Sequence, residues 1–297
     1  MILASHLAQA VDDLVPPDRP LMLHASLRSF AAPIAGGADT LLDVLLTRSR
    51  TVMVPAFTEP QFGLPPPATV TMRPGRNGID YTTLPPMPPP PEGAVYTIDC
   101  GLVNPGLGAL PAVLVNRSGA VRGEHPLNSF AALGPLAGEL IAAQSPTDVY
   151  GPIRELAAHA GLILLIGVGL NRMTALHLAE QQSGRRLLRR WARASNGQTS
   201  MFEVGSCSEG FFRLEAALRR YAHTAVVRGS TWRAYLAKET VDAATAAIRK
   251  DQAITHCPNN DCLLCRDSIA GGPIDPPPIG LRPGLSGPEA MAIRHSV

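Results

Sequence analysis

Short apolar runs separated by polar turns mark the first sixty residues of the chain. Leu21–Leu23 predicts a buried strand that runs into a polar turn. A helix is expected from about Ala38, because apolar residues then recur with helical spacing. Thr51–Pro55 predicts a second strand, since β-branched residues dominate it and a proline ends it. The order strand, loop, helix, strand indicates an α/β sheet.

The segment Gly161–Gly169 is the clearest strand in the chain. It is apolar on both faces, as a central parallel strand is, so we expect it in the middle of the sheet. Thr174 stands where it can cap a following helix that carries Leu176–Glu180. In an open α/β sheet, ligands bind at a turn of this kind. Two further helices are predicted over Leu214–Ala222 and Val241–Lys250.

Proline-rich sequence interrupts this pattern twice. Residues 61–95 contain two proline clusters with no apolar periodicity between them, so we expect an inserted loop or polyproline II segment. This insertion is either a surface loop or a lid over a substrate cleft. From residue 271 the chain is rich in Pro and Gly, which predicts disorder. We therefore expect one α/β domain over residues 1–270 and a disordered tail over residues 271–297.

Composition narrows the class of protein. The 297 residues are 45% hydrophobic and 17% charged, which is typical of a folded globular chain. The first residues lack the basic segment of a secretory signal, and the longest apolar run is about half of the roughly 20 residues that a membrane helix needs. We expect a soluble, cytoplasmic protein without a membrane partner. A net charge of +2 is too small to predict nucleic-acid binding.

His177 and Glu180 are candidate catalytic residues. They are three positions apart on a predicted helix, so both side chains project from one face. Histidine titrates near neutrality, and a neighbouring carboxylate can orient its ring and stabilise its cation, which suits proton transfer. The same spacing is also found on ordinary helix surfaces and around buried core histidines.

Four segments, taken in order, resemble the aminoglycoside 3-N-acetyltransferase family. The first two resemble the family's opening and its central His-Pro segment, the third matches its most specific motif, and the fourth is typical of less studied bacterial members. They are His24–Ser29 with Gly36–Thr40, Val121–Pro126 with Ser129–Gly134, Gly167–Gly169 with Thr174–Glu180, and Val204–Phe211.

This resemblance implies a fold and a reaction. The fold is a mixed central sheet flanked by helices, the antibiotic N-acetyltransferase-like α/β fold, which differs from the GCN5-type fold. Acetyl-coenzyme A is the implied donor, and an amine of an aminoglycoside or a related amino sugar is the implied acceptor. Transfer is then direct, with His177 as the general base. Because an ammonium has no lone pair, the site must remove a proton before the nitrogen attacks the thioester.

The resemblance also assigns roles to three further side chains. Glu180 either orients His177 or holds the acceptor ammonium. Glu209 stands where the family carries an acidic residue at its substrate site, with a solvated turn carboxylate as the alternative. His125 lines the same region, or else stabilises the His-Pro turn.

A loop after the first predicted strand is the candidate coenzyme A site. It consists of Ser26, Leu27, Arg28 and Ser29, which offer hydroxyls, backbone amides and one fixed cation for pantetheine amides and phosphate oxygens. Thr174, at a predicted helix N-terminus, is expected to add to an anion or oxyanion site.

Departures from the family pattern leave the substrate open. Met173, Ala112 and Gly151 stand where the family usually has polar residues, and a run of arginines from Arg185 to Arg193 does not suit a polycationic acceptor. These arginines are expected either on a solvated face or at coenzyme A phosphates. The alternatives to acetylation are an amide-forming transacylase that uses another acyl thioester, and a non-catalytic protein that binds coenzyme A.

Four of the five cysteines form a candidate metal site. Cys262 and Cys265 have the C-x-x-C spacing of a zinc knuckle, Cys257 lies close by, and Cys207 or His256 is available as a fourth ligand. Structural zinc is thus one interpretation. Free thiols, redox chemistry and nucleophilic catalysis by Cys207 are the others. For the oligomeric state we expect a monomer or a homodimer.

Overall fold

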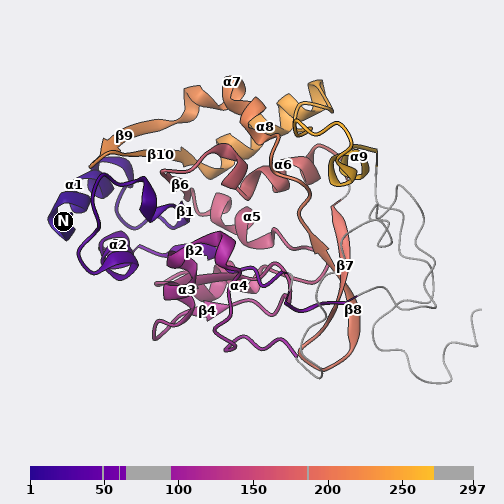
Figure 1. Ribbon diagram of the computed structural model, residues 1–297, viewed down its shortest axis with the longest axis horizontal. Helices are drawn as coiled ribbons and strands as arrows, with labels where there is room; N and C mark the ends of the chain where they lie inside the picture. The colour runs from indigo at the N-terminus through magenta and orange to yellow at the C-terminus, as the bar shows by residue number, and fades with distance from the viewer. Residues whose placement is uncertain (49, 60, 65–94, 186, 271–297) are drawn as a thin grey trace, which may run out of the picture.

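A seven-stranded mixed sheet forms the centre of the protein (Figure 1). The computed structural model describes residues 1–48, 50–59, 61–64, 95–185 and 187–270. The strand order is β4-β5-β2-β1-β6-β10-β9. These strands are β1 (Leu21–Ala25), β2 (Val52–Pro55), β4 (Val121–Arg122), β5 (Phe130–Leu133), β6 (Leu162–Ile166), β9 (His223–Val227) and β10 (Ser230–Leu236).

Helices cover both faces of this sheet. The first face carries α1 (Ala4–Leu14), α2 (Gly37–Leu46) and α3 (Ala109–Val115). The second carries α4 (Ala137–Ala142), α5 (Gly151–Ala158), α6 (Ala175–Gln182), α7 (Glu215–Leu218) and α8 (Ala237–Lys250). The predicted α/β fold, with helices flanking a mixed sheet, is therefore confirmed.

Strand β6 explains why its sequence is apolar throughout. Ile163 and Leu165 point into the core beneath α5, α6 and α8, whereas Leu162, Leu164 and Ile166 point into the core beneath α1 and α2. The strand pairs in parallel with β1 and antiparallel with β10, so its predicted central place is confirmed. Side chains alternate between the two faces of a strand, and both faces here are buried.

A second, smaller sheet consists of β3 (Gly63–Leu64), β7 (Leu188–Arg193) and β8 (Thr199–Val204). Phe62, Tyr96 and Leu127 pack against it to form a third apolar cluster. The predicted insertion 61–95 thus begins as an edge strand of this sheet. Its central part, 65–94, and the predicted disordered tail, 271–297, lie outside the described residues.

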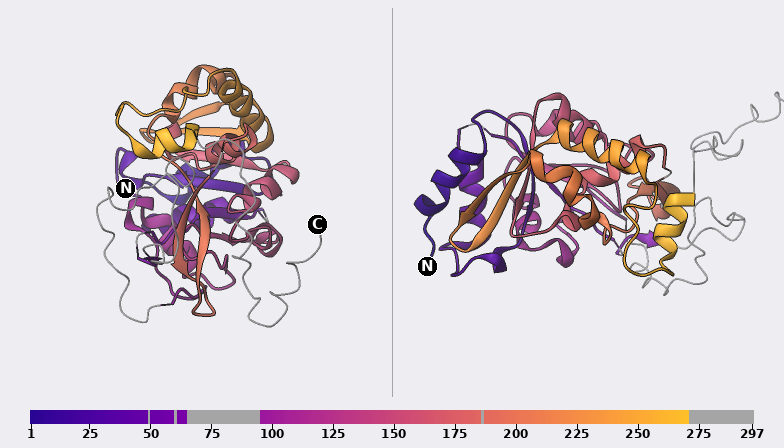
Figure 2. Two further views of the ribbon diagram at one scale, coloured as in Figure 1. Left: turned by 90° about the vertical axis from the view of Figure 1, so that its right-hand side faces the viewer. Right: turned by 90° about the horizontal axis from the view of Figure 1, so that it is seen from above.

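The C-terminal part of the fold packs around α6. The helix predicted over Leu214–Ala222 is shorter, because α7 is a single turn between two 3₁₀ turns. Helix α8 packs against α6, and a loop then leads to α9 (Leu263–Ala270). Figures 1 and 2 show α9 at the opposite end of the molecule from α1. None of the helices in the described ranges is long and apolar enough to cross a membrane.

Candidate active site

Helix α6 presents the predicted pair. His177 Nδ1 lies 2.8 Å from Glu180 Oε2, and the two residues are 7% and 1% exposed. An ionised carboxylate only accepts hydrogen bonds, so Nδ1 must donate, and a neutral ring then keeps its lone pair on Nε2. The pair is therefore arranged with a carboxylate behind the imidazole and a basic nitrogen in front of it.

The carboxylate of Glu180 has four hydrogen-bond partners. Oε2 also accepts from Ser206 Oγ at 2.9 Å, while Oε1 accepts from Arg185 Nη1 at 2.6 Å and from Thr255 Oγ1 at 3.1 Å. Burial alone would raise the pKa of Glu180, but the hydrogen bond and charge of His177 and the charge of Arg185 hold that pKa below its usual value. Because all lone-pair directions are used, this geometry favours the orienting role over direct contact with an acceptor ammonium.

Two aromatic rings and one glycine enclose the imidazole of His177. Tyr150 stacks on it at a centroid distance of 5.9 Å, and Phe211 meets it edge-on at 4.8 Å. A Cβ atom placed on Gly205 would lie 3.0 Å from Nε2 and 2.6 Å from the hydroxyl of Tyr150. A side chain at position 205 would therefore crowd the basic nitrogen, and glycine avoids this.

The hydroxyl of Tyr150 is a second polar atom that lies, like Nε2, close to Gly205. It is buried without a hydrogen-bond partner among the described residues. Burial, followed by the charges of Glu180, Glu203 and Glu59, raises the pKa of Tyr150 well above its usual value, so the hydroxyl stays protonated and remains a donor.

Sequence reasoning missed the groups that hold Glu180. Arg185 was expected on a solvated face or at coenzyme A phosphates, and this was wrong: its guanidinium is buried against Glu180 and Thr255, and Arg190 of the same run is buried as well. Arg185 also donates to the backbone carbonyl of Gln252. Its position five residues after Glu180 was the one available signal, because it places a cation just past the helix that carries the carboxylate.

Glu209 and His125 differ in their exposure to solvent. Glu209 is exposed on the loop after β8, where its carboxylate accepts from Asn171 Nδ2 at 3.3 Å. His125 is buried, and Nε2 donates to the carbonyl of Glu203 while Nδ1 accepts from the amides of Leu127 and Asn128. Burial lowers the pKa of His125 to about 3. Both ring nitrogens form hydrogen bonds with backbone atoms, which favours the turn-stabilising alternative for His125.

The loop predicted for coenzyme A borders a surface hollow. The hollow has a volume of about 380 Å³, and its lining includes Leu27 and Arg28. Ser29 instead bonds to Ser230 Oγ and to the carbonyl of Ser26. Leu27 and Arg28 are thus the members of the predicted set that face open space there, while Ser29 fixes the loop.

Thr174 lies at the N-terminus of α6, as predicted. Its hydroxyl makes no capping hydrogen bond, while its carbonyl accepts from the amide of His177 at 3.0 Å. The side chain of Thr174 therefore does not cap the helix, and its hydroxyl is not used for capping.

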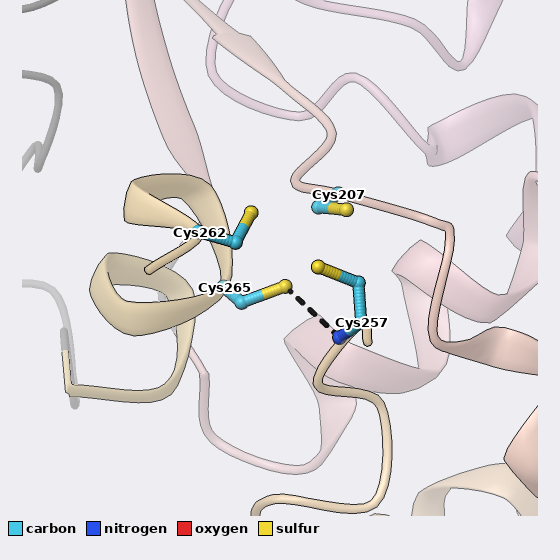
Figure 3. Close-up of side chains that lie close together, drawn as sticks. All are labelled: Cys207, Cys257, Cys262 and Cys265. Atoms are coloured by element: carbon cyan, nitrogen blue, oxygen red, sulfur yellow. Dashed lines mark hydrogen bonds between the residues drawn. The ribbon is translucent and has the colours of Figure 1, made fainter. Parts of the chain in front are cut away.

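The four predicted metal-ligating cysteines come together (Figure 3). The sulfur atoms of Cys207, Cys257, Cys262 and Cys265 all lie within 4.8 Å of one another, and none forms a disulfide. The amide of Cys257 points at the sulfur of Cys265, 3.4 Å away. Hydrogen bonding from Cys265 lowers the pKa of the Cys207 thiol to about 5. Between the two candidates for the fourth position, Cys207 joins the cluster, whereas His256 bonds to the Cys257 carbonyl.

Comparisons with known proteins agree with this fold. An aminoglycoside N(3)-acetyltransferase IX from Micromonospora chalcea is 42% identical over 92 residues, which are 30% of this chain and 33% of that protein. An aminoglycoside N(3)-acetyltransferase III from Salmonella sp. is 33% identical over 167 residues, 54% of this chain and 53% of that one. The matched part thus spans about a third to a half of these curated relatives.

Solved structures match over more of their length. The crystal structure of a histidine variant of aminoglycoside acetyltransferase AAC(3)-IVa in complex with a gentamicin superposes with a TM-score of 0.70 at 21% identity, covering 91% of this chain and 97% of that one. The YokD protein from Bacillus subtilis gives 0.68 at 18% identity, covering 84% and 100%. The family model for aminoglycoside 3-N-acetyltransferases matches residues 22–249, more than half of the chain. The chain therefore belongs to the aminoglycoside 3-N-acetyltransferase family.

Proposed function

We propose that this protein transfers the acetyl group of acetyl-coenzyme A to a primary amine, with His177 as the general base. The observation that carries the proposal is the buried His177–Glu180 pair, whose geometry leaves Nε2 as the accepting nitrogen. Family membership supports the reaction class. Because acetyl-coenzyme A is a metabolite of the cytoplasm, we also expect the enzyme to act there.

In the proposed step, proton transfer comes before bond formation. His177 Nε2 removes a proton from the acceptor ammonium, and the freed lone pair attacks the thioester carbonyl. The new carbon–nitrogen bond forms while the carbon–sulfur bond breaks, and the coenzyme A thiolate leaves. The proton held by the imidazolium neutralises that thiolate. The nitrogen loses its second proton to solvent as it becomes an amide, so one ammonium and one thioester give one amide, one thiol and one proton. Glu180 stabilises the imidazolium while it exists, and Tyr150 supplies a hydroxyl donor beside the reacting groups.

Coenzyme A is proposed to bind at the loop Ser26–Ser29. The hollow beside Leu27 and Arg28 supports this, since Arg28 offers a fixed cation for phosphate oxygens. Thr174 is proposed to hold the thioester end, because its hydroxyl makes no capping hydrogen bond at the start of the helix that carries His177.

The acceptor is proposed to be an aminoglycoside or a related amino sugar. Exposed Glu209, on a loop that flanks the site, can attract a second ammonium of such a molecule. The objection from the arginine run weakens, because Arg185 is neutralised inside the protein by Glu180.

The direct test is an acyl-transfer assay. Purified protein is mixed with acetyl-coenzyme A and a panel of aminoglycosides and simple amino sugars, and free thiol release is measured together with product mass. We expect at least one acceptor to gain 42 Da, the mass that acetylation adds by its chemistry, in stoichiometry with thiol release. If other acyl thioesters react and acetyl-coenzyme A does not, the transacylase alternative holds. Calorimetric binding of coenzyme A without turnover on any acceptor would show a non-catalytic protein.

We further propose that the cysteine cluster holds a structural zinc ion. Four thiolates at roughly 2.3 Å from zinc place their sulfurs about 3.8 Å apart in a tetrahedron, which suits a cluster within 4.8 Å. The four ligands come from two loops and the start of α9, so the ion would join segments that are distant in the sequence.

Metal content tests this site. Protein purified without added metal is expected to contain one zinc per chain by inductively coupled plasma mass spectrometry. Cys265→Ser should abolish stoichiometric zinc, whereas Cys100→Ser should retain it, because Cys100 lies outside the cluster. A wild-type chain that stays metal-free after refolding with excess zinc, and shows four reactive thiols at the cluster, would reject the site.

A further inference from the structure

The loops that carry two of the cysteines also carry two hydroxyls that hold the catalytic carboxylate. Ser206 immediately precedes Cys207, and Thr255 stands two residues before Cys257. Ser206 bonds to Oε2 of Glu180 at 2.9 Å, and Thr255 bonds to Oε1 at 3.1 Å. One loop therefore reaches each oxygen of the same carboxylate, and each loop ends in the cysteine cluster.

Arg185 joins the second of these loops to Glu180. Its Nη1 lies 2.5 Å from Thr255 Oγ1 and 2.6 Å from Glu180 Oε1, and its Nη2 donates to the carbonyl of Gln252. Glu180 and Thr255 are 1% and 2% exposed. Hydrogen bonds in so dry a setting are strong when complete and costly when one partner is displaced. The position of this loop therefore decides whether Glu180 keeps its partners.

Neither loop belongs to a helix or a sheet whose backbone hydrogen bonds would hold it in place. Residues 205–208 and 251–262 form turns and irregular backbone between β8, α8 and α9. They meet at Gly210, where a Cβ would lie 2.1 Å from the carbonyl of Thr255, and at the cysteines. Besides this packing and the shared carboxylate of Glu180, the sulfur cluster joins the two loops.

We propose that a zinc ion on the four cysteines clamps Ser206 and Thr255 onto Glu180 and thereby positions His177 for catalysis. The inference rests on the proposed acetyl transfer and on the proposed zinc site. The cysteines act here as positioning residues, because the chain of contacts runs from sulfur through the loops to Glu180 and then to His177. Loss of the metal releases the loops, and the imidazole then lacks its fixed partner.

The test is a double-mutant cycle between the cluster and the hydroxyl. Cys262→Ser, Thr255→Val and the double variant are compared with wild type, and Cys100→Ser is the matched control. Metal content, the kcat and KM for acetyl-coenzyme A, and hydrogen exchange of peptides over 204–210 and 252–258 are measured well below each variant's unfolding temperature. Circular dichroism confirms that each variant is folded.

Cys262→Ser should lose zinc, exchange faster in both peptides and lower kcat by about 10- to 100-fold, the cost of a misplaced catalytic group. The KM for acetyl-coenzyme A should stay within about twofold, because none of the residues that line the hollow beside Arg28 belongs to either loop. Thr255→Val should keep its zinc and still lower kcat. In that background Cys262→Ser should cost clearly less than it does alone, since both changes act through Glu180.

Strictly additive losses in kcat, or a zinc-free folded Cys262→Ser enzyme with wild-type kcat, would overturn the clamp while leaving the acetyl transfer intact. If Cys262→Ser is too unstable to assay, a zinc-loaded Thr255→Val variant with unchanged kcat would overturn it equally. Failure of the wild type to acetylate any amine is a different result, because it rejects the proposed function itself.

Discussion

His177→Gln should lower kcat/KM for the best acceptor by about 10²- to 10⁴-fold, the usual contribution of a positioned general base. Glutamine keeps much of the size of the ring between Tyr150 and Phe211, but it has no nitrogen lone pair basic enough to take a proton from an ammonium. The loss should fall on kcat, because proton removal belongs to the chemical step. Steady-state kinetics with acetyl-coenzyme A at saturation measure it.

The same variant should show what His177 does not do. Binding of coenzyme A, measured by calorimetry, should stay within about threefold of wild type, since the proposed donor site lies on the Ser26–Ser29 loop. His159→Gln is the matched control, because this histidine sits at the end of α5 and contacts Glu139 and Glu155. A His177→Gln enzyme that keeps more than a third of wild-type kcat would remove the imidazole from the mechanism.

Local sequence patterns could predict the parts of the site that lie on one element. His177 and Glu180 share a helix, so their spacing alone predicted the contact now seen at 2.8 Å. The unbroken apolar run of β6 likewise predicted its central place, because both faces of that strand are buried. In each case the information lay within a few residues of the chain.

The partners of Glu180 could not be predicted in this way. Ser206 and Thr255 stand 26 and 75 residues further along the chain, and no local sequence pattern predicts that they contact α6. The burial of Arg185 could not be predicted for another reason, since it is the first of a run of arginines and such runs usually face solvent. Only the fold shows that the first of these arginines turns inward.

The cysteines fall between these two cases. The C-x-x-C pair and nearby Cys257 are local, so their grouping was readable from spacing. The choice of Cys207 as the fourth member was open until the fold brought the loop after β8 next to α9. Long-range packing thus completes a set of ligands that the sequence shows in part.

Glu180→Gln should reduce both activity and stability, and for separate reasons. The amide cannot stabilise an imidazolium, so we expect kcat to fall by about 10²-fold or more. It also leaves the guanidinium of Arg185, whose side chain is 2% exposed, without its carboxylate. Removing one partner of a buried ion pair typically costs about 3–5 kcal/mol in the free energy of unfolding. Urea denaturation and steady-state kinetics measure the two effects.

Acidity should change the size of the stability effect in a defined direction. The pKa of Glu180 is held below its usual value in the folded protein, so its carboxylate stabilises the fold above the unfolded pKa. That contribution disappears as the pH falls through the lowered folded pKa. The difference in unfolding free energy between wild type and Glu180→Gln should therefore be largest at neutral pH and shrink in acid.

A second substitution separates the two reasons. Arg185→Met in the Glu180→Gln background removes the unpaired cation, so the double variant should recover much of the unfolding free energy without recovering kcat. Glu139→Gln is the matched control, because its carboxylate is exposed and pairs with His159 at the surface. If the double variant regains activity along with stability, Glu180 serves only to neutralise Arg185. If activity stays low in a stable protein, the carboxylate acts on His177 itself.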